Sequence, residues 1–133
     1  MKSKIANDKE KAILDAFWDK DSDYTTMEIL EVLEREYPGE WNRLGVFRTV
    51  NGLLEKELLV VTGLEQNKTQ YARKYRPSMT REEYAAFLLE YEGMDITSLD
   101  RIALAMFKRN KTSKKDRKKL LDNLQNIIDN LDD

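Results

Sequence analysis

The chain has 133 residues, of which 41% are hydrophobic and 36% are charged. This balance excludes a disordered chain and predicts one folded domain or two very small ones. The formal net charge is −2, from 23 basic and 25 acidic residues, which excludes a bulk polycation but leaves room for a local basic face. Cysteine and histidine are both absent. Thiolate and imidazole chemistry is therefore excluded, and no catalytic residue, metal ligand or cofactor is predicted.

Location is indicated by what the sequence lacks. No apolar run approaches the roughly 20 residues that a membrane span needs, and residues 1–11 contain no apolar signal-peptide core. We expect a cytoplasmic protein with no membrane partner.

Three amphipathic helices are predicted in the first part of the chain. The first covers residues 8–20, with Asn7 or Asp8 as its N-cap. The second covers residues 26–37, and Thr25 with Glu28 predicts a capping box at its start. Their apolar faces are formed by Ala12, Ile13, Ala16 and Phe17, and by Met27, Leu30, Val32, Leu33 and Tyr37.

The third helix is predicted over residues 43–57, after Pro38 and Gly39 end the second. One face carries Val46, Val50, Leu53, Leu54 and Leu58, and the other carries Arg48, Asn51, Gly52 and Glu55. Two short strands at residues 59–61 and 69–76, joined by a polar tip, then predict a β-hairpin. The order of helix, helix, helix and hairpin is that of a winged helix-turn-helix. The predicted fold is therefore mainly α with a small β-hairpin, and the predicted DNA-binding domain is residues 1–77.

Residues 78–133 are predicted to form a helical dimerisation region. Thr80 and Ser113 are expected helix caps, and residues 96–107 form another apolar stripe. Three short helices bury their apolar faces poorly alone, so a two-fold homodimer is expected. The predicted dimerisation residues are Leu99, Ile102, Met106, Leu120, Leu124, Ile127, Ile128 and Leu131.

Charge is distributed unevenly along the chain. Residues 1–41 contain 6 basic and 11 acidic residues, whereas residues 42–76 contain seven basic and three acidic ones, a net charge of +4. The excess lies on the third helix and the hairpin, which are the elements that a winged helix presents to DNA. A second basic run, residues 108–119, is interpreted as a solvent-facing loop and helix start rather than a phosphate site.

Three segments carry a resemblance to a known family. They are residues 12–18 (AILDAFW), residues 47–59 (FRTVNGLLEKELL), and Tyr75-Arg-Pro77 followed by Thr80-Arg-Glu-Glu-Tyr84. Their order and spacing resemble the penicillinase-repressor, methicillin-repressor and copper-repressor family of bacterial winged-helix regulators, over about residues 8–131. The resemblance implies a homodimeric repressor of transcription that binds a palindromic operator in double-stranded DNA, with an upstream sensor protein as a further partner.

The resemblance also implies which residues face DNA. They are Asn42, Arg43, Arg48, Thr49 and Asn51 around the third helix, with Lys68 and Arg73 in the wing. Arg48 is expected to bind a guanine edge, Asn51 an adenine or a phosphate, and Arg43 and Lys68 phosphates. Alignment on Asn51-Gly-Leu53 places Phe47 where relatives often carry arginine, whereas alignment on Arg48-Thr49 needs a slip of one residue. The base-reading position is therefore defined to within one residue.

The residues that two known switches of the family use are not present in this chain. The protease-cut branch uses an Asn-Phe bond, but residues 105–107 read Ala-Met-Phe here, and the copper-responsive branch uses cysteines that this chain lacks. The third helix also resembles that of ferric-uptake regulators, whose second domain needs His and Cys, so that family is set aside.

Two tryptophans and an aspartate-rich segment have alternative interpretations. Trp18 and Trp41 are predicted to be core residues rather than stacking platforms. Asp19, Asp21 and Asp23 alternate as in a calcium loop, but Tyr24 and Leu30 replace its glycine and glutamate. The principal alternative to DNA binding is a winged-helix protein-interaction module, an adaptor or antirepressor. A neutral or acidic third-helix face would favour that alternative.

Overall fold

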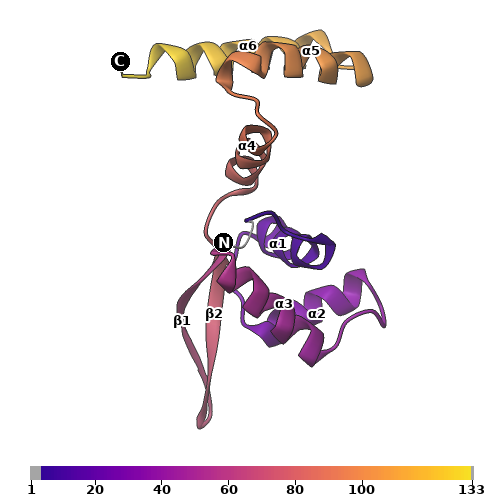
Figure 1. Ribbon diagram of the computed structural model, residues 1–133, viewed down its shortest axis with the longest axis vertical. Helices are drawn as coiled ribbons and strands as arrows, with labels where there is room; N and C mark the ends of the chain where they lie inside the picture. The colour runs from indigo at the N-terminus through magenta and orange to yellow at the C-terminus, as the bar shows by residue number, and fades with distance from the viewer. Residues whose placement is uncertain (1–3, 133) are drawn as a thin grey trace. The chain divides into compact units, whose positions relative to one another are not determined.

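The computed structural model describes residues 4–132; residues 1–3 and 133, the outer ends of the two predicted domains, lie outside this range. The chain divides into two compact units, of which one ends at Leu88 and the other begins at Leu89. Figure 1 shows the elements in chain order, which are α1 (Asp8–Lys20), α2 (Thr26–Glu36), α3 (Arg43–Glu55), β1 (Leu59–Asn67), β2 (Gln70–Pro77), α4 (Arg81–Tyr91), the 3-10 turn η1 (Ile96–Ser98), α5 (Leu99–Arg109) and α6 (Lys114–Asp129). The predicted fold class, mainly helical with one antiparallel hairpin, is confirmed.

Polar side chains fix where the helices of the first unit begin. Asn7, rather than Asp8, caps α1, because its Oδ1 accepts a hydrogen bond from the Glu10 backbone N–H at 2.8 Å. The capping box predicted for α2 is confirmed, since Thr25 and Glu28 each accept from the backbone N–H of the other. Thr80 and Glu83 form the same reciprocal pair at the start of α4. Each pair satisfies N–H groups that have no partner within the helix.

One core lies between α1, α2 and α3, and the base of the hairpin closes it. The fully buried side chains include Phe17 of α1, Leu33 of α2 and Leu53 of α3. Tyr75 of β2 and Tyr84 of α4 extend the same cluster. Tyr84 also accepts a hydrogen bond from the Ala6 backbone N–H at 2.8 Å, so the first turns of α4 belong to the winged-helix unit.

The hairpin is longer than predicted, because β1 continues to Asn67 through the segment expected to be a polar tip. Asn67 pairs with Gln70, so the turn is only Lys68 and Thr69, and Lys68 has a φ of 60°. Ladder hydrogen bonds use backbone groups, and polar side chains therefore do not end a strand that lies in solvent. In Figure 1 the hairpin extends beyond the three helices.

The second unit has no buried side chain among its described residues. The helix predicted over residues 96–107 begins as η1, which Asp95 caps, and continues as α5. Ser113 caps α6 as predicted, but α6 ends at Asp129, so Leu131 lies beyond the helix. No helix in the described part of the chain is long and apolar enough to cross a membrane.

Candidate nucleic-acid interface

Helix α3 turns one face to the core and the other to solvent. Val46, Val50 and Leu53 are buried. The opposite face exposes Leu44, Phe47, Arg48, Asn51 and Glu55. Arg48 and Asn51 therefore lie together on the outer face of the second helix of a helix-turn-helix, the helix that enters the major groove in such folds.

Asn42 and Thr49 are held by local hydrogen bonds. Asn42 caps α3, with its Oδ1 accepting from the Gly45 backbone N–H at 2.7 Å. The Thr49 hydroxyl donates to the Gly45 carbonyl at 2.8 Å, and its side chain is half-buried. The Asn42 amide nitrogen remains a donor, whereas Thr49 keeps only acceptor capacity and its methyl group.

All four predicted DNA-facing cations are exposed. Arg43 and Arg48 lie on α3, Lys68 lies in the hairpin turn, and Arg73 lies on β2 opposite Leu64. Within residues 4–132 none of these four side chains forms an ion pair. Their charge is not neutralised by neighbouring carboxylates and is available to phosphates.

Arg76, by contrast, is used to hold the wing to the helices. Its guanidinium contacts Asp23 Oδ1 at 3.0 Å. The hydrogen bond from Thr62 and the nearby Arg76 lower the pKa of Asp23. The adjacent Tyr24 and Tyr75 exchange two backbone hydrogen bonds, of 3.1 and 2.8 Å. The loop before α2 is thus attached to the outer edge of β2, which fixes the base of the wing.

A buried carboxylate, which was not predicted from the sequence, positions the C-terminal end of α3. Glu10 of α1 is 4% exposed and forms an ion pair with Lys56, whose Nζ also donates to the Ile5 carbonyl at 3.0 Å. A Cβ at Gly52 would lie 2.8 Å from Glu10 Oε2. The prediction that Gly52 lies on the outer face is therefore wrong, because the glycine allows α3 to approach this carboxylate. The sequence signal was the glycine within an otherwise regular helix.

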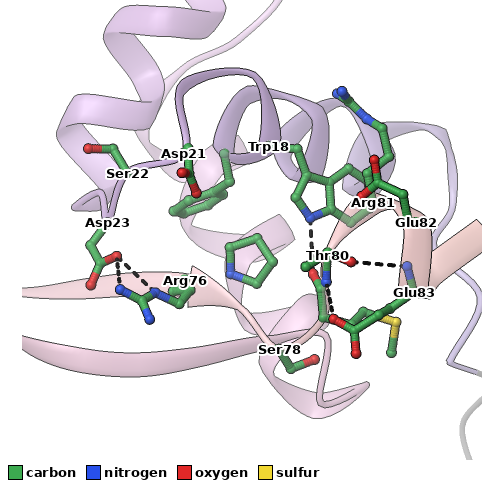
Figure 2. Close-up of a pocket in the computed structure, with 13 residues that line it drawn as sticks. Trp18, Asp21, Ser22, Asp23, Arg76, Ser78, Thr80, Arg81, Glu82 and Glu83 are labelled. Carbon is green, nitrogen blue, oxygen red and sulfur yellow. Dashed lines mark hydrogen bonds and ion pairs between the residues drawn. The ribbon is translucent and has the colours of Figure 1, made fainter. Parts of the chain in front are cut away.

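A cavity of about 580 Å³ lies between the end of α1, the end of β2 and the start of α4. Figure 2 shows that some of its polar side chains contact one another, with Arg76 bonded to Asp23 and Thr80 to Glu83. Arg81 is bonded to Asp19 at 2.7 Å, and this bond raises its pKa further. The bond between Arg81 and Asp19 attaches the start of α4 to the end of α1 in the winged-helix unit.

Both tryptophans lie at the edge of the core. Trp18 donates from Nε1 to the Met79 carbonyl at 3.1 Å, and Trp41 packs against the core cluster. Both side chains are half-buried. The prediction of core positions holds for their packing but not for full burial, because cationic side chains lie over the rings, Lys9 over Trp41 and both Lys11 and Arg81 over Trp18.

Two of the three aspartates in the segment that resembles a calcium loop have other partners. Asp19 accepts from Arg81, and Asp23 accepts from Arg76. Within the described residues no group of three or more carboxylate, histidine or cysteine side chains could hold a metal ion.

An apolar groove lies beside the exposed face of α3. Thr26, Met27 and Leu30 of α2 and Arg43, Leu44 and Phe47 of α3 line it; we call it the α2–α3 groove. Met27 was predicted to pack on the apolar face of α2 but is 46% exposed, and Leu44 and Phe47 are each 55% exposed. The sequence signal is the spacing of Leu44, Phe47 and Arg48, which places two apolar residues on the outer face of α3.

The predicted dimerisation residues are distributed over α5 and α6. Ile102 and Leu124 are half-buried. The remaining six are exposed, namely Leu99, Met106, Leu120, Ile127, Ile128 and Leu131. On α6 they recur at the spacing of one helical face. Lys and Arg residues of the basic run at 108–119 are exposed.

One comparison with known proteins gave a match. A family model described as penicillinase repressor matches residues 6–126, from the residue before the α1 cap to the last turn of α6. A comparison with curated protein sequences found no match.

Proposed function

The chain belongs to the penicillinase repressor family, a family of DNA-binding transcriptional repressors, and we propose that it represses transcription by binding a palindromic operator as a homodimer. The observation that carries this proposal is the set of exposed, unpaired cations on α3 and the wing (Arg43, Arg48, Lys68 and Arg73). In a helix-turn-helix these positions face the duplex.

The proposed roles follow from side-chain chemistry. The Arg48 guanidinium can donate two hydrogen bonds to a guanine, and the exposed Asn51 amide can pair with an adenine or bind a phosphate. Arg43, Lys68 and Arg73 neutralise phosphates and fix the register of the protein on DNA. Asn42 donates from its amide nitrogen while its oxygen caps α3. Thr49 contributes only through its methyl group or a lone pair.

The unpartnered apolar face of the second unit supports the homodimer. Side chains such as Ile127 and Ile128 remain exposed in one chain. A two-fold partner that presents the same face would bury them, and it would place two winged helices against two half-sites. A palindromic operator is the sequence that matches this symmetry.

The proposed mechanism is occupancy of promoter DNA in the cytoplasm, without catalysis. A sensor protein that relieves repression would act by a route other than cleavage of an Asn-Phe bond, since residues 105–107 read Ala-Met-Phe.

We propose DNA rather than a protein as the partner because of the charge on the outer face of α3. This face carries two basic residues, Arg43 and Arg48, and one acidic residue, Glu55. This face is neither neutral nor acidic, so it lacks the feature that would favour the protein-interaction module.

The proposal is tested by fluorescence anisotropy. Labelled promoter duplexes from the organism that encodes the protein are titrated with the full chain at several salt concentrations. We expect selective binding whose affinity falls with salt, with a log-log slope of roughly −0.9 for each neutralised phosphate. Equal affinity for random duplex, with no dependence on salt, would contradict the proposal.

A further inference from the structure

We propose that the α2–α3 groove reads thymine, by seating the 5-methyl group of the base against Phe47. This inference rests on the proposed function and names the base class that the recognition surface selects. The groove is about 330 Å³ and has a largely apolar floor.

The first argument is that the exposed apolar side chains are contiguous. Met27, Leu44 and Phe47 are each about half exposed, although they come from two different helices. Apolar side chains that are scattered singly over a surface need no explanation, but a patch assembled from two elements marks a binding surface. Folding of the first unit leaves this patch uncovered, whereas other aliphatic residues of the same two helices, such as Ile29 and Leu33 of α2 and Val46 of α3, are buried.

The second argument is the charge around the groove. Thr26 is the first residue of α2 and Arg43 is the first residue of α3, so both helices begin at the groove. The amino-terminal ends of helices attract anions, and phosphate in particular. Arg43 lines the groove and Arg48 follows Phe47 by one residue, and neither forms an ion pair within residues 4–132. An apolar floor with a cationic rim therefore faces solvent.

This combination matches the major groove of DNA. Phosphates flank the groove, and the thymine methyl is an apolar group that a base edge presents there, where Phe side chains are among its known contacts. Phe47 and Arg48 are adjacent on the exposed face of α3. They can therefore contact neighbouring base pairs, Arg48 by hydrogen bonds and Phe47 by apolar contact.

The experiment replaces thymine by deoxyuridine, which lacks only the 5-methyl group. Duplexes that bind the full chain are selected from a randomised library, and each thymine of the selected sequence is then replaced singly. We expect an affinity loss of about fourfold at defined thymines in each half-site, the loss equivalent to exposing one buried methyl group. Other thymines should tolerate the replacement.

Three variants assign the effect to the groove. Phe47→Ala should bind the thymine and uracil duplexes equally, whereas Phe47→Leu should retain part of the preference. Tyr37→Ala is the matched control, because Tyr37 is also an exposed aromatic residue of the first unit but does not line the groove, and it should keep the full preference. Thermal unfolding checks that each variant is folded, which is expected since more than half of the Phe47 side chain is exposed.

The outcomes separate this inference from the proposed function. Tight binding that tolerates uracil at every position overturns thymine reading and leaves the repressor proposal intact. Retention of the preference by Phe47→Ala overturns the role of Phe47. Absence of binding to any duplex, or capture of a protein partner through Phe47 instead of DNA, overturns both.

Discussion

Leu33 in the first unit and Ile128 in the second are both aliphatic residues on the apolar face of a helix, yet Leu33 is fully buried and Ile128 is 62% exposed. The first unit packs three helices and the base of a hairpin around one core. The second unit has the same kind of amphipathic helix but, among its described residues, no side chain is buried. The difference indicates that the first unit contains the partners that its own apolar residues need, whereas the second lacks them within one chain.

The largest expected effect is at the dimer interface that we propose for the second unit. Leu124→Asp places a charge at the centre of the apolar face of α6, and an uncompensated charge buried in the dimer costs about 3–5 kcal/mol. We expect sedimentation to show a monomer whose first unit is still folded. Asn126→Asp adds the same charge on the opposite face of α6 and should leave the dimer intact. A Leu124→Asp variant that remains dimeric would show that this face is not the interface.

The next effect concerns the first unit alone. Glu10→Ala removes the partner of Lys56 and half of the α1 capping box, and we expect unfolding free energy to fall by about 2–4 kcal/mol. Chemical denaturation measures this loss. Asp8→Ala, an exposed acid in the same first turn, should cost far less. Equal effects of the two changes would mean that the buried ion pair does not stabilise the fold.

Arg48→Ala tests the exposed face of α3, and we expect a loss of binding free energy of intermediate size. Loss of a bidentate guanine contact should weaken binding to the selected operator by about 1–3 kcal/mol and relax preference at one base. Lys68→Ala should weaken binding to all sequences and reduce the salt slope by about 0.9. Lys20→Ala, an exposed cation at the end of α1, is the control. An Arg48→Ala protein with unchanged specificity would exclude base reading by that residue.

A smaller effect is expected at Gly52. Gly52→Ala should destabilise the protein by about 1 kcal/mol, because contact with the fixed Glu10 carboxylate outweighs the gain in helix propensity. In a Glu10→Ala background the contact is absent, so the same change should be neutral or stabilising. A double-mutant cycle by denaturant titration measures the difference. Additive effects would exclude the close approach.

The smallest effect is the pH dependence at Asp23. Its pKa is lowered in the folded protein by Thr62 and Arg76, so its contribution to stability is present above the ordinary value of 3.8 and is lost as pH falls through the lower folded pKa. Asp23→Asn should remove this acid-labile part, measured as a flatter dependence of the unfolding temperature on pH below about 4. An unchanged acid limb would contradict the assignment.

The sequence predicted the parts of the fold that depend on local rules. The capping residues Thr25, Thr80 and Ser113 and the periodicity of α1 to α3 placed the helices to within a few residues. Tertiary contacts were not predictable in the same way. Nothing local indicates that Glu10 and Lys56, 46 residues apart in the sequence, form an ion pair, or that Gly52 is required beside them.

In the candidate site, too, local features could be predicted from the sequence and tertiary contacts could not. Exposure of Arg48 and Asn51 follows from the spacing of Val46, Val50 and Leu53 and was predictable. The α2–α3 groove was not predicted, because it forms only where the starts of two helices meet, and Met27 then has no neighbour to cover it. The exposed faces of α5 and α6 were predictable as apolar stripes, but no described residue of the same chain buries them.

The most direct test of the account is the mass of the complex that the full chain forms with its selected duplex, measured by sedimentation equilibrium. The account predicts two protein chains on each duplex, with the two half-sites separated by a whole number of helical turns. A complex with one chain on each duplex, or no complex at any protein concentration, would contradict it.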